Sequence, residues 1–149
     1  RYGEKIATLI SSLQSDPAVR LVGFSAGAAA IWRVCATELG ENIEAAYGFY
    51  PGQVRHDTQM IPNCPVELYF PFEEAQFDVT GVIRQLQLHS NCVCFQNSLP
   101  HGYINPQSKH HRTDESAAVQ AILANLPGLA NDGALALQLA KTPLGYRAL

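Results

Sequence analysis

Three kinds of side chain in this 149-residue sequence could together perform nucleophilic chemistry: a serine, a carboxylate and a histidine. Ser25 is the middle residue of the pattern Gly-Phe-Ser-Ala-Gly at 23–27, which follows an apolar run and precedes an alanine-rich segment. Small neighbours allow a serine to occupy a tight turn between a strand and a helix, with its hydroxyl exposed. A serine hydroxyl attacks a carbonyl group when a histidine removes its proton and a carboxylate orients that histidine. Ser25 is therefore the predicted nucleophile.

The histidine and the acid follow Ser25 in the chain, each after an apolar segment that reads as a strand. His101 is the histidine, and the adjacent residues Glu73 and Glu74 are candidate acids. In an open parallel sheet, reacting groups gather at the carboxyl ends of the strands, so we expect these side chains to lie close together. Asp78 is a third candidate acid, although its position also suits the cap of a helix.

Other residues could complete such a site. The backbone N–H of Ala26, at the start of the helix after Ser25, would face a developing oxyanion. Tyr50 at the end of a predicted strand and Tyr103 beside His101 are candidate substrate-binding residues, although such aromatic side chains more often pack in a core.

The elements that must position these residues alternate along the chain. The predicted strands are 19–24, 44–50, 66–70 and 92–96. The predicted helices are 2–13, 27–39, 78–88 with Asp78 as cap, 113–125 with Thr113 or Asp114 as cap, and 134–141. This alternation predicts a three-layer α/β/α fold with a mostly parallel sheet of about four strands.

Length and composition fit one domain over residues 1–149. The chain is 47% hydrophobic and 15% charged, which is enough apolar material for a core and suits buried strands. Its net charge of −3 offers no basic surface for nucleic acid or an anionic membrane. No apolar stretch reaches the length that spans a bilayer. We therefore expect neither a nucleic-acid nor a membrane partner.

The cysteines and a histidine pair do not form a metal-binding pattern. The four cysteines are Cys35, Cys64, Cys92 and Cys94. Cys92 and Cys94 would share one face of a strand, but no histidine lies nearby to complete a site. Side chains of adjacent residues, such as His110 and His111, rarely coordinate the same metal ion. We therefore expect buried free thiols in a cytoplasmic protein that needs no metal and no cofactor.

Several segments, in their order and spacing, resemble the dienelactone hydrolase family of α/β-hydrolases. They are the serine pattern at 23–27, Gly48-Phe49-Tyr50, the strand at 66–70, and His101-Gly102-Tyr103 with Asn105-Pro106 behind it. The resemblance covers about residues 25–126 and includes the chain order serine, acid, histidine. It implies that Glu74 takes the place of the family's triad aspartate, Pro71 that of a preceding glycine, and His101 that of the triad histidine.

The resemblance implies a serine hydrolase that acts on a small ester, lactone or related acyl substrate. Ser25 would attack the carbonyl carbon, His101 would act as general base and then general acid, and Glu74 would orient His101. Ala26 would hold the oxyanion.

The chain departs from the family in three ways. Ser25 stands where the family usually has cysteine, and Glu74 stands where aspartate is usual. The fold normally has several strands and a helix before the serine turn, whereas one helix precedes it here. The missing part would supply a second oxyanion N–H and much of the pocket. We therefore expect an α/β-hydrolase-like domain that is incomplete at its N-terminal side.

The apolar strand 19–24 would then lack a neighbour on one side. In this chain only the strand 44–50 can pair with it, and exposed apolar edges promote pairing with another chain. We expect a homo-oligomer, or completion of the sheet by a missing N-terminal segment. The alternative function is a catalytically silent or fragmentary domain of this fold that serves as an interaction or assembly module.

Overall fold

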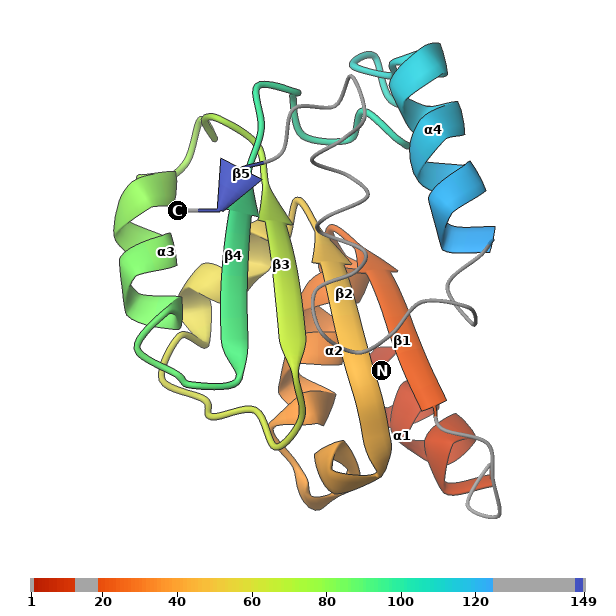
Figure 1. The fold of residues 1–149 in the computed structure, drawn as a ribbon, viewed down its shortest axis with the longest axis vertical. Coiled ribbons are helices and arrows are strands. Elements are labelled where there is room, and N and C mark those ends of the chain that lie inside the picture. The colour runs from red at the N-terminus through yellow and green to blue at the C-terminus, as the bar shows by residue number, and fades with distance from the viewer. Residues whose placement is uncertain (1, 13–18, 125–146, 149) are drawn as a thin grey trace.

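The computed structural model describes residues 2–12, 19–124 and 147–148, which form one sheet with helices on both faces (Figure 1). The strands are β1 (Val19–Phe24), β2 (Ile43–Phe49), β3 (Val66–Phe70), β4 (Cys92–Gln96) and β5 (Arg147–Ala148). The α-helices are α1 (Tyr2–Ser12), α2 (Ala26–Cys35), α3 (Val79–Leu86) and α4 (Thr113–Ala124), and the 3-10 helices are η1 (Glu38–Asn42) and η2 (Gly52–His56).

The strands lie in the order β1-β2-β3-β4-β5. The strands β1 to β4 are mutually parallel, whereas β5 runs antiparallel to β4 with Ala148 opposite Phe95. The predicted fold class, a three-layer α/β/α arrangement with a mostly parallel sheet of about four strands, is confirmed. The short strand β5 was not predicted. Among the described residues β1 is an edge strand whose one strand neighbour is β2, as the sequence predicted.

One face of the sheet packs against α1, α2 and α3, and its core is largely aliphatic. Trp32 of α2 is fully buried in this core, and its indole N–H donates to the backbone oxygen of Asp57 at 2.9 Å. The small residues at the start of α2 let the helix approach the sheet closely. A Cβ on Gly48 of β2 would lie 3.1 Å from the Cβ of Ala28. Close packing of this kind fixes the position of α2 relative to the strand ends.

The other face carries aromatic side chains and is covered in part by α4. Rings from neighbouring strands stack across the sheet: Phe24 with Phe49 at 5.3 Å between centroids, Phe49 with Tyr69 at 4.8 Å, and Tyr69 with Phe95 at 5.1 Å. Offset stacking of this kind adds to the free energy gained by burial. Val119 anchors α4 in this second core and is fully buried.

The predicted and observed elements agree closely, with one clear difference. The strands β1, β3 and β4 have the predicted bounds, whereas α2 ends at Cys35 and not at residue 39. The chain turns there because Gly40 packs against the end of α2, where a Cβ would lie 2.2 Å from the carbonyl oxygen of Cys35. A short 3-10 helix, η1, takes up the remaining residues. The predicted helix at 134–141 lies outside the described residues.

Within the described part of the chain, none of the helices has the length and apolar character that crossing a bilayer requires. The four cysteines are free and buried, and the Sγ atoms of Cys92 and Cys94 lie 4.0 Å apart. The described residues bring no three His, Cys, Asp or Glu side chains together in a way that could hold a metal ion.

Replacing Asp78 tests the cap of α3. Both carboxylate oxygens accept backbone N–H bonds, from Thr80 and from Gly81, each at 3.1 Å. Asp78→Ala leaves these donors without a side-chain acceptor and is expected to lower the free energy of unfolding by about 1 kcal/mol. Asp78→Asn keeps an acceptor and is expected to stay within about 0.5 kcal/mol. Urea unfolding measures both, and an unchanged stability of Asp78→Ala would contradict the assignment.

Candidate active site

Ser25 lies at a strained turn between β1 and α2. Its backbone φ of 52° and ψ of −119° are unusual for a residue with a side chain. The turn is held because the Ser25 N–H donates to the carbonyl oxygen of Phe49 at 3.0 Å, while its own carbonyl oxygen accepts from Ala29 at 3.2 Å. Such strain persists only where the surrounding structure imposes it. The half-buried Ser25 side chain stands at the carboxyl end of β1.

The ends of the other parallel strands lie beside Ser25. The backbone ladder continues past the last residues of the strands: the Tyr50 N–H donates to the carbonyl of Tyr69 at 2.7 Å, and that of Asn97 donates to Phe70 at 3.1 Å. The segments that follow β1, β2, β3 and β4 therefore emerge at one edge of the sheet, as parallel pairing requires.

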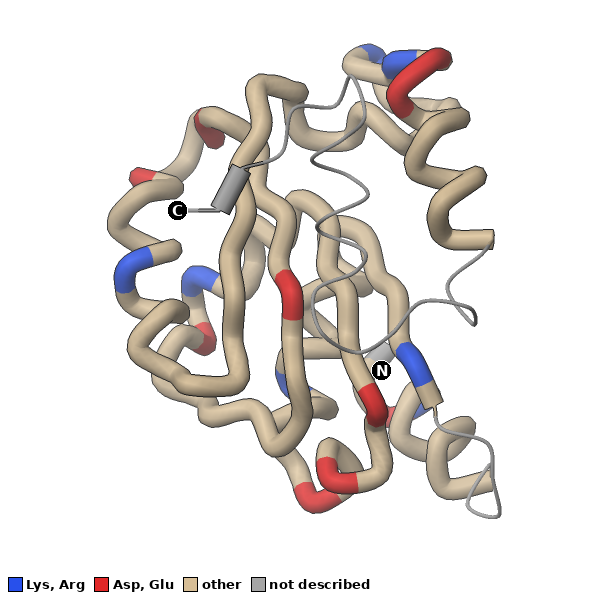
Figure 2. Tube along the Cα trace, viewed as in Figure 1, with Lys and Arg blue, Asp and Glu red and all other residues tan. Residues whose placement is uncertain are grey.

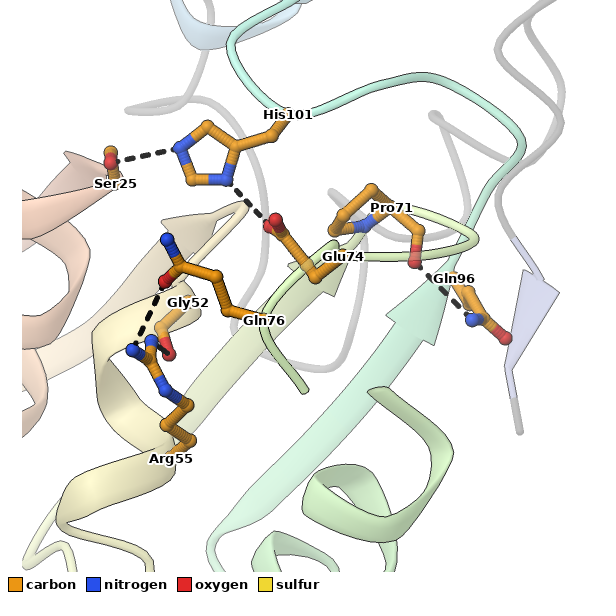
Figure 3. A network of polar contacts seen from close by, with 8 residues as sticks. All are labelled: Ser25, Gly52, Arg55, Pro71, Glu74, Gln76, Gln96 and His101. Atoms are coloured by element: carbon orange, nitrogen blue, oxygen red, sulfur yellow. Dashed lines mark hydrogen bonds and ion pairs between the residues drawn. The ribbon is translucent and has the colours of Figure 1, made fainter. Parts of the chain in front are cut away.

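Three side chains from these segments form one hydrogen-bonded chain (Figure 3). The Oγ of Ser25 lies 3.0 Å from Nε2 of His101, and Nδ1 of the same ring lies 2.6 Å from Oε1 of Glu74. Ser25 and Glu74 thus contact opposite nitrogens of one imidazole. The side chain of Glu74 is 14% exposed and that of His101 is 37% exposed.

The chemistry of the donors fixes the direction of this chain. An ionised carboxylate can only accept, so Glu74 holds the ring proton on Nδ1 of His101. Nε2 is then left with a lone pair that can accept the hydroxyl proton of Ser25. The arrangement prepares a serine for deprotonation and can stabilise the imidazolium that results.

The competing acids occupy other positions. Asp78 caps α3 through its two backbone bonds. Glu73 is exposed, and the carboxylate in contact with His101 is that of Glu74. The adjacent residues Glu73 and Glu74 therefore have different surroundings, although the sequence gives them the same chemistry.

The segment that carries Glu74 is anchored by Arg55 and Gln96, two residues that were not among the predicted site residues. The guanidinium of Arg55 in η2 donates to the Gly52 carbonyl at 2.8 Å and to Oε1 of Gln76 at 3.2 Å, and it lies 5.1 Å from the ring centroid of Phe77. Gln96 at the end of β4 holds the other side of the segment. Its amide nitrogen donates to the carbonyls of Pro71 and Phe72, at 3.2 and 2.9 Å. Figure 3 shows Arg55 and Gln96 on either side of Glu74. No local sequence pattern signals these long-range anchors.

The loop that carries His101 is held by internal bonds and by α4. Gly102 has a φ of +81°, which a side chain would resist, and a Cβ there would lie 2.8 Å from the Oγ of Ser108. The buried Ser116 hydroxyl of α4 donates to the carbonyl of Ile104 at 3.0 Å. The ring of His101 also packs against that of Tyr50, with centroids 4.8 Å apart. These contacts restrict the position of the imidazole between Ser25 and Glu74.

The other predicted site residues, Ala26, Tyr50 and Tyr103, differ in their exposure and in whether they line the cavity. Ala26 is exposed and is the first residue of α2, so its N–H has no acceptor within the helix. Tyr50 lines the cavity next to Ser25, and its burial raises the pKa of its phenol to about 12. Tyr103 is 2% exposed and packs edge-on against Tyr50 at 5.8 Å, so it supports the site from behind without lining the cavity.

A cavity of about 850 Å³ lies beside Ser25 and His101. Its described lining residues come from the ends of β1 and β2, the His101 loop and the C-terminal half of α4: Phe24, Ser25, Tyr50, His101, Gly102, Ile104, Asn105, Pro106, Ser108, Gln120, Leu123 and Ala124. The volume is typical of sites for small molecules. The contribution of α4 to the cavity has no signal in the sequence, because its lining residues lie far from Ser25 in the chain and carry no reactive groups.

The comparisons with known proteins give little information on function. No family model matches the chain. A similar protein is the uncharacterized protein YczH of Bacillus subtilis (strain 168), which is 29% identical over 110 residues. The match covers 72% of this chain and 53% of YczH, so the chain spans about half the length of this relative.

The two glycines that flank Ser25 are expected to respond differently to alanine. A Cβ on Gly23 would lie 2.6 Å from Cδ1 of Ile31 and 2.8 Å from the backbone nitrogen of Ala28, whereas a Cβ on Gly27 meets nothing within 4 Å. Gly23→Ala should therefore lower the free energy of unfolding by about 1–3 kcal/mol. Gly27→Ala should leave it unchanged or raise it by up to about 1 kcal/mol, because alanine favours a helix. Denaturant unfolding of both variants provides the measurement, and equal effects would contradict this account of the turn.

Proposed function

We propose that the protein is a serine hydrolase that acts on a small ester, lactone or related acyl substrate. The observation that carries this proposal is the hydrogen-bonded chain from Ser25 through His101 to Glu74 at the rim of a small-molecule cavity. The serine hydroxyl, the imidazole and the carboxylate are arranged as acyl transfer through a serine requires. The resemblance to the dienelactone hydrolase family points to the same chemistry.

In the proposed first step, the Oγ of Ser25 attacks the carbonyl carbon of the substrate. Nε2 of His101 takes the hydroxyl proton, and Glu74 stabilises the imidazolium through the Nδ1–H bond. The negative charge that develops on the carbonyl oxygen is stabilised by the N–H of Ala26, with help from the positive end of the α2 dipole. The imidazolium then gives its proton to the leaving alcohol oxygen as the C–O bond breaks.

The second step releases the acid. A water molecule gives a proton to Nε2 of His101 and attacks the acyl carbon. The ester bond to Ser25 then breaks, and the serine oxygen regains its proton from the imidazolium. The unusual backbone angles of Ser25 suit this cycle, because the turn exposes the hydroxyl to the cavity while its neighbours stay in the sheet and the helix.

The alternative is a domain of this fold that does not catalyse and instead mediates assembly. The edge position of β1 favours it, because an edge strand can pair with a strand from another chain or another segment. We also propose that β1 pairs with a second copy of the chain in a homo-oligomer, or with a further segment of the protein. The four free, buried cysteines fit the proposed cytoplasmic location.

A fluorophosphonate probe separates the two functions. The probe loses fluoride to an activated serine and is expected to label the folded protein at Ser25, because His101 can remove the hydroxyl proton. Ser25→Ala should abolish labelling and reduce ester hydrolysis to background. Ser90→Ala, at an exposed serine after α3, is the matched control and should label like the parent. Mass spectrometry of the labelled peptide locates the adduct, and absence of labelling in the folded parent would favour the assembly module.

Replacing each of the two neighbouring glutamates by glutamine tests which one acts as the acid. Glu74→Gln keeps the size of the side chain but removes the charge that holds the proton on Nδ1, so kcat is expected to fall on the order of 10³- to 10⁴-fold. Glu73→Gln removes the same charge one residue away and should change kcat by less than about twofold. Steady-state hydrolysis of 4-nitrophenyl butyrate measures both.

The pH dependence of the parent provides a second measurement. A protonated imidazole cannot accept the Ser25 proton, so kcat/KM should fall when the solution is made acidic. Equal losses in the two glutamate variants, or a kcat/KM that does not fall in acid, would contradict the assigned roles.

A further inference from the structure

We infer that the cavity beside Ser25 selects substrates with an uncharged hydrocarbon chain and discriminates against substrates that carry a carboxylate or an ammonium group there. This inference rests on the proposed hydrolase function and specifies the class of substrate.

The walls of the cavity are mainly apolar. The side chains that contribute hydrocarbon surface are Phe24, Tyr50, Ile104, Pro106, Leu123 and Ala124. The polar residues at the rim, Asn105, Ser108 and Gln120, are uncharged. None of the described residues that line the cavity is Lys, Arg, Asp or Glu. Tyr50 also stays neutral, because burial raises its pKa to about 12.

The described charged residues on the elements around the cavity do not line it. On the His101 loop, Lys109 is exposed and Arg112 lines a different cavity. The acidic residues of α4, Asp114 and Glu115, are in its first turn, and Figure 2 shows no charged residue in the rest of that helix. The lining residues Gln120 and Leu123 follow Glu115 by five and eight residues, or about 7.5 and 12 Å along the helix axis. At Leu123 this separation exceeds the Debye length of about 8 Å at physiological ionic strength. On β1, Arg20 is paired with Glu44 at 2.7 Å and precedes Phe24 by four residues, or about 13 Å.

A second cavity, which shares His101 with the first, is more polar. It has a volume of about 680 Å³, and its lining includes Glu73, Glu74, His110 and Arg112. His101 lines both cavities, whereas Ser25 lines only the first of the two. A charged part of a substrate that occupies the cavity beside Ser25 would therefore contact mainly apolar walls.

A charge in such a space loses hydration without gaining a partner. The same walls favour hydrocarbon, because each methylene removed from water contributes to binding. Leu123 and Ile104, which face the cavity from α4 and from the His101 loop, would contact the chain of the substrate. Substrates with longer hydrocarbon chains should therefore bind the cavity more tightly, and a charged end group should weaken binding.

Three 4-nitrophenyl esters with six-carbon acyl chains test the inference: the hexanoate, the adipate monoester with a terminal carboxylate, and the 6-aminohexanoate with a terminal ammonium. We expect kcat/KM for the hexanoate to exceed that for each charged ester about 30-fold or more. From acetate to hexanoate it should rise about two- to fourfold per methylene.

Two variants of α4 locate the effect in the cavity. Leu123→Arg places a cation in the apolar wall and is expected to improve the adipate monoester relative to the hexanoate about tenfold. Ala117→Arg adds the same charge to an exposed position of α4 outside the cavity and should leave that ratio within about twofold. If Leu123→Arg does not fold, Leu123→Ala should lower the gain in kcat/KM per methylene from acetate to hexanoate, and an unchanged gain would overturn the inference.

The outcomes separate this inference from the function on which it rests. Hydrolysis of a charged ester by the parent as fast as of the hexanoate would overturn the inference while supporting the hydrolase. Absence of hydrolysis of all the esters, together with absence of fluorophosphonate labelling, would overturn the proposed hydrolase function and the inference with it.

Discussion

Parallel pairing of β1 to β4 is the constraint on which the candidate site depends. Parallel strands end at the same edge of a sheet, so the segments that follow them must start next to one another. The ladder even continues beyond the strands, since the N–H of Ser25 bonds the carbonyl of Phe49 and that of Tyr50 bonds the carbonyl of Tyr69. Side chains that are 76 residues apart in the chain, Ser25 and His101, thereby come within 3.0 Å.

The backbone brings these segments together, but the orientation of the side chains depends on bonds between the loops. Arg55 and Gln96 hold the segment of Glu74, one from η2 and one from the end of β4. Ser116 of α4 holds the loop of His101 through the carbonyl of Ile104. A carboxylate and an imidazole that are both held in this way need little rearrangement when the charge moves during a reaction.

The two faces of the sheet have different structural roles. The aliphatic face fixes α2, whose first residues form the turn around Ser25 and whose Trp32 is fully buried. The aromatic face continues into the apolar cavity through Phe24 and Tyr50, whose ring centroids lie 6.1 Å apart with the ring planes tilted by 42°. The core that stabilises the fold and the cavity that would receive a substrate therefore share side chains, and a change of specificity in this cavity also changes packing.

The sequence by itself determined the local elements and the kinds of reactive group. Continuous apolar runs define strands without reference to other parts of the chain, so β1, β3 and β4 have the predicted bounds. The small residues around Ser25 likewise predict a tight turn, although only at Gly23 does the structure leave no room for a Cβ. The cap at Asp78 is also local, because its acceptors and donors are three residues apart or fewer.

Local patterns in the sequence left Glu73, Glu74 and Asp78 open as the acid, and only the family resemblance favoured Glu74. The tertiary structure decided which carboxylate contacts His101 and what surrounds Ser25. Glu73 and Glu74 have the same chemistry in adjacent positions, and the segment that carries them is held by Arg55 and Gln96, which are 19 and 22 positions from Glu74. The cavity wall from α4 and the strand β5 depend in the same way on contacts between distant segments. Such contacts are set by the packing of whole elements, and a local sequence pattern does not contain this information.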